Sequence, residues 1–293
     1  RGMFPEVVSP TTTLGPLKPD FLECSGLNNI NVVSSLTHDT ACAVAACPAD
    51  MKRWAYISSG TWSLIGLELS EPILTDDCRE LNFTNEIGFG NSTRLLKNII
   101  GLWLVQECRR SWANQGNQYS YEQLTEMAIN SKSHQSVLDP LDPRFIAPDN
   151  MPKLISEICN ETNQLVPTTP GEIIRCALAS LALLYAKTLC EAEELVGWKV
   201  EKLHIVGGGS KNVLLNQLTA DAANIDVIAG PAEATASGNV LVQAIANGIV
   251  SDLDEARQIV HRSFDTETFN PKASLELENM TNRFNQICTV SSL

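Results

Sequence analysis

The feature that most constrains the fold of this chain is a glycine-rich turn between a short apolar run and an amphipathic one. Residues 203–206 have the character of a β-strand, three glycines occupy 207–209, and residues 211–221 have the apolar spacing of a helix, which Ser210 is expected to cap. Backbone N–H groups and the positive end of the helix dipole would then face a ligand at the turn. The pattern predicts a nucleotide site, and an ordinary strand-to-helix turn is the alternative.

A second strand and helix come after this turn. Residues 225–228 form a short apolar run, Gly230 and Pro231 mark a turn, and residues 240–248 have helical spacing. A strand, glycine turn, helix, strand and helix make half of an open α/β domain, which binds ligands at the carboxyl ends of its strands. The sequence contains no Walker A pattern, which argues against an ordinary P-loop NTPase.

Charge and hydropathy narrow the class of protein. The 293 residues carry a net charge of −13, and 44% of them are hydrophobic, enough for one large domain or two ordinary ones. Nucleic acid and anionic membranes would both need a basic face, so neither is expected as a partner. The longest apolar run near the middle, residues 177–185, is short for a membrane span, and the first residues do not have the pattern of a signal peptide. We therefore expect a cytoplasmic protein.

Cysteine and histidine spacing indicates no metal site. The nine cysteines include no C-x-x-C pair, and the four histidines are far apart in the sequence. Reduced, buried thiols are therefore expected. Cys159 and Cys176 are predicted on consecutive helices that can fold back on each other, so a disulfide between them is possible, although free thiols are favoured in a reducing compartment.

The first fifty residues bury little surface by themselves. A strand and turn are predicted at 11–17, a strand at 30–36, and a helix of small residues at 41–47 that Pro48 ends. These elements either pack on the rest of the chain or belong to a domain that is not complete here. We place a boundary near residue 50.

Three further elements are predicted after that boundary. Residues 54–59 and 61–69 form a hairpin with Gly60 at its turn. Apolar residues from Leu95 to Cys108 recur at helical spacing, with Asn98 and Gln106 flanking the apolar face. A capping box at Thr169 opens a long helix that runs to about Val196 and is apolar nearly all round, so it should be buried.

Asp39 is the candidate reactive group. It lies between a predicted strand and a small-residue helix, where the helix dipole favours an anion. A carboxylate in that place can accept a proton from a substrate hydroxyl. A plain capping aspartate, a common residue at helix starts, is the alternative.

Taken together, these motifs resemble a known family. In order along nearly the whole chain, they are similar to the carbohydrate kinases that include glycerol and xylulose kinases. The matching segments are residues 38–40 and 43–46, 58–63, 94–98 and 101–103, 106–109, 207–210, and 216–217 with 220–221. The resemblance implies an α/β, actin-like (ribonuclease-H-like) sugar kinase fold, of which this chain holds mainly the second domain.

The same resemblance implies two domains with different binding roles. Residues 1–50 would be the carboxyl-terminal piece of the first kinase domain and residues 51–293 the second, nucleotide-binding domain. The missing amino-terminal kinase domain would supply most sugar contacts and the carboxylates that help ATP hold Mg²⁺. No metal ligand is expected in this chain.

The resemblance also implies roles, residue by residue. Asp39 would be the catalytic base, and His38, Asp39 and Thr40 would bind the sugar substrate. The residues that would bind ATP are Gly60, Thr61, Asn98, Gln106, Gly207, Gly208, Gly209 and Asn212. Ser237 departs from the family, where a larger apolar residue is usual, and this puts local packing in doubt.

Within the family, the resemblance is best to kinases that phosphorylate L-rhamnulose at its C1 hydroxyl in the catabolism of L-rhamnose. Residues 94–98 and 142–145 carry that distinction. The alternatives are a kinase for another ketose, such as L-fuculose or L-xylulose, and a non-catalytic, actin-like nucleotide-binding protein. A dinucleotide oxidoreductase is disfavoured because the acidic residue expected after a second strand is missing.

Overall fold

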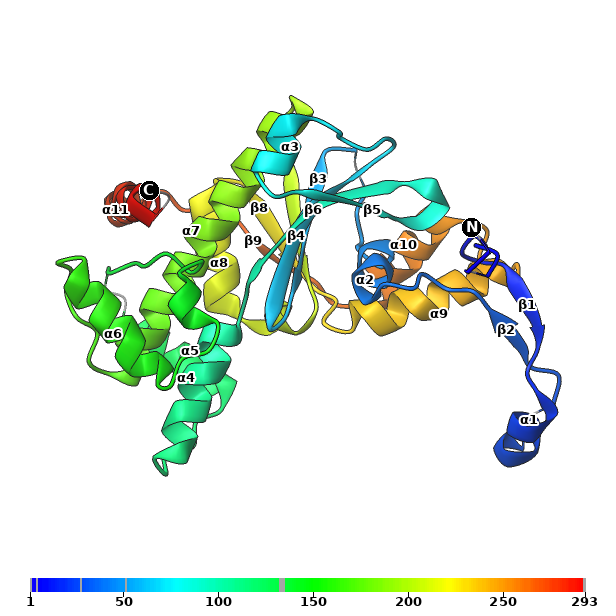
Figure 1. Ribbon diagram of the computed structural model, residues 1–293, viewed down its shortest axis with the longest axis horizontal. Helices are drawn as coiled ribbons and strands as arrows, with labels where there is room; N and C mark the ends of the chain where they lie inside the picture. Colours follow the sequence, from blue (N-terminus) through cyan, green and yellow to red (C-terminus); the bar gives the residue numbers. More distant parts are fainter. Residues whose placement is uncertain (1, 4, 27, 51, 132–134, 292–293) are drawn as a thin grey trace.

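A mixed seven-stranded sheet lies at the centre of the molecule (Figure 1). The computed structural model describes residues 2–3, 5–26, 28–50, 52–131 and 135–291. The strand order is β5-β6-β4-β3-β7-β8-β9, in which β3, β7 and β8 are parallel and the other neighbours antiparallel. The strands are β3 (Trp54–Ser59), β4 (Trp62–Leu69), β5 (Thr84–Ile87), β6 (Thr93–Ile100), β7 (Lys202–Val206), β8 (Asp226–Ala229) and β9 (Glu267–Phe269).

Helices cover both faces of the sheet, because both faces are apolar. Along β3, Ala55 and Ile57 belong to the large core under α7, whereas Trp54 and Tyr56 belong to a smaller core with residues of α2. This alternation is the period of an extended strand. On the first side lie α7 (Pro170–Val196) and α8 (Val213–Ala223), with α4 (Trp103–Asn114), α5 (Tyr121–Asn130), α6 (Met151–Glu161) and α11 (Leu275–Ser291) beyond them. On the second lie α2 (Asp39–Ala45), α9 (Ala234–Ala246) and α10 (Leu253–Ser263).

Helix α7 lies at the centre of the larger core. The predicted capping box is confirmed: Thr169 accepts a hydrogen bond from the Glu172 N–H, and the Glu172 carboxylate accepts one from Thr169. By length and composition this helix could cross a membrane, but 83% of its most apolar window is buried inside the protein. Its apolar surface is thus used for internal packing, as predicted.

Helices α2 and α9 cross at close range. Gly238 of α9 lies against the backbone of α2, where an added Cβ would collide with the carbonyl oxygen of Cys42. Residues 40–47 are all buried. Of the two alternatives for the first fifty residues, packing on the rest of the chain therefore holds for α2.

The chain before α2 is different. Strands β1 (Thr13–Pro16) and β2 (Asn31–Val33) form a separate two-stranded sheet, with α1 (Pro19–Ser25) between them, and this unit extends away from the main sheet (Figure 1). None of the residues of α1 is buried. The proposed boundary near residue 50 remains a prediction. A short helix, α3 (Asp76–Glu80), and three 3₁₀ turns, η1 (Phe89–Asn91), η2 (Pro143–Phe145) and η3 (Gly208–Lys211), complete the fold.

The expected helix over residues 95–108 is wrong in its first half. Residues 93–100 are strand β6, and the helix begins at Trp103. Strand β6 is buried on both faces: Leu95 and Ile99 point to the α7 side and Leu96 to the α2 side. A strand covered on both faces loses the alternation of polar and apolar residues, so its apolar positions imitated helical spacing.

Two helix starts also differ from expectation. Asn212, and not Ser210, caps α8, because the 3₁₀ turn η3 is inserted after the glycines; the Asn212 side chain accepts a hydrogen bond from the Leu215 N–H at 3.0 Å. The Ser210 hydroxyl instead donates to the carbonyl oxygen of Gly207 at 2.8 Å. Helix α9 begins at Ala234, earlier than predicted, and Ser237 lies in it, with its hydroxyl bonded to the Glu233 carbonyl.

Candidate active site

The β3–β4 hairpin presents its turn to the start of α4. The N–H groups of Gly101 and Trp103 donate to the carbonyl oxygen of Thr61, both at 3.1 Å, and the Leu102 N–H donates to that of Gly60 at 2.9 Å. These bonds fix α4 against the turn. They also bring the Thr61 hydroxyl to 3.1 Å from Oε1 of Gln106, so two residues expected to bind ATP are in contact.

The glycine turn lies beside this hairpin because β7 pairs with β3. Gly207 has φ of 84°, and a Cβ there would lie 2.8 Å from the carbonyl oxygen of Ser59. A Cβ on Gly209 would collide with the Ser59 side chain, whereas one on Gly208 would meet no atom within 4 Å. Packing against the end of β3 thus explains two of the glycines. Only Gly208 leaves space in front of the turn.

A cavity of about 610 Å³ lies between the glycine turn, α4 and α5. We call it the Gln106 cavity. Leu102, Val105, Ile129 and Val213 give it apolar walls, and Gln106 adds a polar group. Apolar walls with a few polar groups suit a flat heteroaromatic ring. The remaining residues that line it are Gly60, Tyr121, Glu122, Thr125, Glu126, Gly208, Gly209, Lys211 and Asn212.

A second cavity, of about 480 Å³, adjoins the first. We call it the Asp39 cavity. It shares Gly60 and Gly208 with the Gln106 cavity, so the two meet at the hairpin and the glycine turn. The remaining residues that line it are His38, Asp39, Thr40, Ser58, Ser59, Thr61, Trp62, Leu64, Asn98, Gly207, Ala232, Glu233 and Thr235.

Asp39 is the first residue of α2, and His38 is the N-cap. Oδ1 of Asp39 accepts hydrogen bonds from the Thr40 N–H at 2.6 Å and the Thr40 hydroxyl at 3.3 Å, and its side chain is 78% exposed. The carboxylate is therefore oriented by its own helix and open to the cavity. Asp39 can accept a proton from a hydroxyl placed there.

The predicted site residues divide between the two cavities. Those predicted to bind the sugar all line the Asp39 cavity, and Gln106, Gly209 and Asn212 line the Gln106 cavity. Asn98 is separated from Gln106 because it lies on β6, on the same face as Leu96, and so it lines the Asp39 cavity. Glu233, at the start of α9, was not singled out from the sequence; nothing local distinguishes it from other carboxylates, and only the fold brings it to the cavity.

Within the described ranges, no three His, Cys, Asp or Glu side chains are grouped in a way that could hold a metal ion. The thiols of Cys159 and Cys176 are free, buried and 3.8 Å apart, so the predicted proximity of α6 and α7 at these positions is confirmed.

Comparison with known proteins identifies the family. Residues 55–247 match the C-terminal domain of the FGGY family of carbohydrate kinases. The chain belongs to this family. It is 45% identical over 269 residues to a rhamnulokinase of Bacillus subtilis, covering 92% of this chain and 55% of that protein. It is 43% identical over 295 residues to a rhamnulokinase of Enterococcus faecalis, covering 99% and 58%. The chain thus spans little more than half the length of these relatives.

Solved structures of FGGY-type kinases share the fold. A xylulose kinase from Rhodospirillum rubrum superposes with a TM-score of 0.69 at 13% identity, over 97% of this chain and 56% of that one. A Plasmodium falciparum glycerol kinase solved with ADP gives a TM-score of 0.70 at 16% identity, over 97% and 56%. The expected actin-like sugar kinase fold is confirmed.

Proposed function

We propose that the full-length protein is an ATP-dependent rhamnulokinase that transfers the γ-phosphoryl group to the C1 hydroxyl of L-rhamnulose. The observation that carries this is that the two cavities meet at Gly60 and Gly208: a nucleotide bound in one of them would extend past these glycines toward the carboxylate that is open to the other. The relatives named rhamnulokinase, at 43% to 45% identity, support the choice of sugar.

The adenosine of ATP would occupy the Gln106 cavity, between its apolar walls. The phosphates would cross Gly60 and Gly208, which line both cavities, toward Thr61 and Asn98. His38 and Thr40 would hold the sugar, with its C1 hydroxyl near Asp39. As the hydroxyl oxygen bonds to the γ-phosphorus and the bond to ADP breaks, Asp39 would take the proton. A base of this kind contributes about 10² to 10⁴-fold to the rate.

Magnesium would neutralise the phosphate charge in this reaction. The donor set of the Asp39 cavity offers two carboxylates, Asp39 and Glu233, and the first is needed as the base. We therefore assign the metal mainly to the phosphates of ATP and water, with help from the domain that precedes this chain. We also propose a cytoplasmic location, in keeping with an ATP-dependent step of sugar catabolism.

The test is an assay of the full-length protein with ATP against L-rhamnulose, L-fuculose and L-xylulose. The proposal predicts the highest kcat/KM for L-rhamnulose. A higher value for another ketose would move the protein to that substrate, and no phosphorylation of any sugar would favour a non-catalytic nucleotide-binding role.

A further inference from the structure

A buried cation lies on the face of β6 that looks toward α2. The Arg94 side chain is 2% exposed, and its Nη2 donates to Oε2 of Glu86 on β5 at 2.8 Å. Its Nε and Nη2 also donate to the carbonyl oxygen of Ile87, both at 3.3 Å. The register of β5 and β6 sets residues 86 and 94 opposite each other. A buried guanidinium requires a counter-charge, so the carboxylate of Glu86 is held in place.

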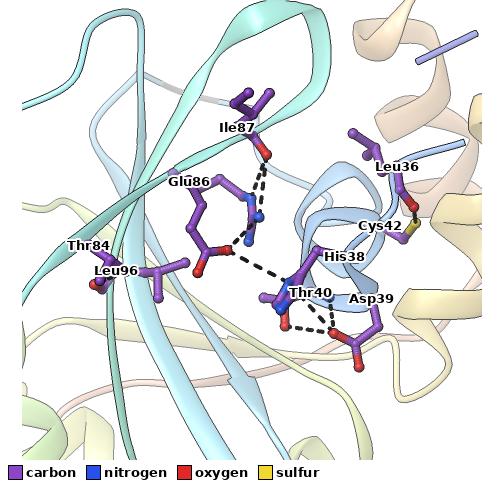
Figure 2. A network of polar contacts seen from close by, with 10 residues as sticks. Leu36, His38, Asp39, Thr40, Cys42, Thr84, Glu86, Ile87 and Leu96 are labelled. Carbon is purple, nitrogen blue, oxygen red and sulfur yellow. Dashed lines mark hydrogen bonds and ion pairs between the residues drawn. The ribbon is translucent and has the colours of Figure 1, made fainter. Parts of the chain in front are cut away.

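The oxygen of Glu86 that meets this guanidinium also lies near His38, a residue of the Asp39 cavity. Oε2 of Glu86 lies 3.8 Å from Nδ1 of His38, and the same nitrogen lies 3.7 Å from Oδ1 of Asp39. Figure 2 shows His38 between the two carboxylates, with Glu86 reaching it from the strand and Asp39 from the helix. Glu86 does not line the Asp39 cavity itself. It reaches the cavity only through His38.

This placement decides which nitrogen of His38 faces a ligand. The two carboxylate oxygens lie 3.7 and 3.8 Å from Nδ1, so they favour the tautomer with its proton on that nitrogen, which leaves Nε2 for the cavity. The His38 side chain is 49% exposed, so few packing contacts hold its ring. A carboxylate fixed by a buried arginine supplies the missing constraint, as outer carboxylates do for functional histidines elsewhere.

We propose that Glu86, anchored by Arg94, is a positioning residue that orients His38 for binding the hydroxyl groups of the sugar. This inference rests on the proposed function, because it takes the Asp39 cavity to be the sugar site. It adds a specificity determinant from β5, a strand without any group predicted to touch substrate.

The test is Glu86→Gln in the full-length protein. The amide keeps the size of the side chain but loses its charge, so the KM for L-rhamnulose should rise about 10-fold, with kcat and the KM for ATP changed less than about 3-fold. Glu68→Gln is the matched control. Glu68 is also largely buried, pairs with Arg257 at 2.8 Å, and stands opposite Arg94 on β4, but it has no contact with His38. Its sugar KM should stay near that of the wild type. Equal sugar KM changes in both variants would contradict the proposal.

A double-mutant cycle separates positioning from folding. If Glu86 acts through His38, adding Glu86→Gln to His38→Ala should raise the sugar KM no further than His38→Ala alone. If the double variant instead raises the sugar KM by the product of the two single effects, the two residues act independently and the idea is overturned.

A second double variant, Glu86→Gln with Arg94→Met, removes both charges of the buried pair, so the fold is not left with an uncompensated buried charge. The sugar KM of this variant should remain raised. A return to the wild-type value would show that the Glu86–Arg94 pair only supports the fold, which would contradict the proposal.

The outcome for the proposed function is read separately. If the wild type phosphorylates L-rhamnulose and Glu86→Gln leaves the sugar KM unchanged, this inference alone is defeated. If another ketose is the substrate, the same comparison is made with that sugar. If no ketose is phosphorylated, the proposed function fails, and ¹⁵N NMR of the histidine rings decides the positioning. The His38 signals, assigned by their loss in His38→Ala, should show a proton on Nδ1 that shifts in Glu86→Gln and not in Glu68→Gln. Identical shifts in all three proteins would overturn the inference.

Discussion

The carboxylate of Asp39 is held by its own helix and is otherwise open to solvent. At the scale of residues, this separates it from Glu86 and Glu68, carboxylates that are engaged by arginines. The two bonds from Thr40 orient Asp39 without burying it. A group that must exchange a proton with a substrate needs this combination of orientation and access.

Replacing Asp39 by Asn in the full-length protein should lower kcat at least about 10²-fold, because the amide cannot take the hydroxyl proton. Sugar binding should change by only a small factor. Steady-state kinetics and calorimetric sugar titration measure the two effects. Asp76→Asn is a matched control: Asp76 is also the first residue of a helix and is 84% exposed, but it lies on α3, outside the cavity. A near-normal kcat in Asp39→Asn would remove Asp39 from the mechanism.

His204 on β7 gives the fold its own pH dependence. The ring is fully buried and stands nearly perpendicular to that of Trp54, with centroids 5.7 Å apart, and neither nitrogen has a hydrogen-bond partner among the described residues. Burial lowers the pKa of His204 to about 4. Between that pH and about 6.5, the ordinary pKa of histidine, the unfolded chain binds a proton that the folded chain does not. The free energy of unfolding therefore falls as the pH drops through this window.

His204→Phe should remove that dependence. Chemical denaturation at pH 7.5 and pH 5 measures the free energy of unfolding. Between these two pH values it should fall by about 2 kcal/mol more in the wild type than in the variant, since each pKa unit is worth about 1.4 kcal/mol. The carboxylates titrate alike in both proteins and cancel in the comparison. Parallel losses of stability would mean that the imidazole is hydrated or charged in the folded state.

At the scale of elements, the sequence predicted best where local chemistry decides the structure. The hairpin at Gly60 and the capping box at Thr169 are specified by residues within a few positions of each other, and both are present. The helix expected over strand β6 is wrong because the environment of this strand comes from elements far away in the chain: α7 on one side and α2 on the other bury apolar residues on both of its faces. The pairing of Glu86 with His38 also depends on strand register, which no local pattern encodes.

The glycine turn offers a paired test of packing against ligand access. Gly208→Ala should fold normally, because the new Cβ would meet no atom within 4 Å, yet weaken ATP binding by narrowing both cavities. Gly209→Ala should lower thermal stability, because its Cβ would collide with the Ser59 side chain on β3. Thermal melts and ATP titrations of the two variants give the comparison. Equal melting temperatures would contradict the packing explanation.

Helices α6 and α7 bring two thiols together without joining them. Cys159 and Cys176 are both buried, so oxidants reach them poorly and both should remain reduced in the isolated protein. Denaturation in an alkylating reagent without reductant, followed by peptide mass spectrometry, should find both cysteines alkylated. A peptide pair linked through these two residues would establish the disulfide instead.

At the scale of the whole molecule, the unit of β1, α1 and β2 should behave differently from the rest of the chain. The sequence indicates little buried surface over the whole of residues 1–50, which predicts weak protection from hydrogen exchange throughout that segment. The structure moves the dividing line to the start of α2, because residues 40–47 are buried against α9 and α10, whereas the two-stranded sheet before them stands apart. Hydrogen exchange of the 293-residue chain should be fast in β1 and β2 and slow in α2. Uniform protection across both would contradict this.

The same chain should bind ATP weakly and have no kinase activity. It supplies both cavities, but in-line transfer needs the sugar and the γ-phosphate held together, and we propose that most sugar contacts come from an amino-terminal domain outside this chain. Nucleotide titration and a rhamnulose phosphorylation assay of the 293-residue chain test the two halves of this prediction. Measurable phosphorylation would show that one side of the cleft suffices.

The close crossing of α2 and α9 at Gly238 has a mechanical consequence. Because the backbones touch there, the helix that begins with Asp39 packs directly on the part of the chain that carries Gly60 and Gly208. If the sugar-holding domain swings during the catalytic cycle, this packing leads us to expect the bending before His38, in the short segment between β2 and α2, and not at the boundary proposed near residue 50. The base and the phosphate path would then keep a constant separation through opening and closing, and only the sugar would travel.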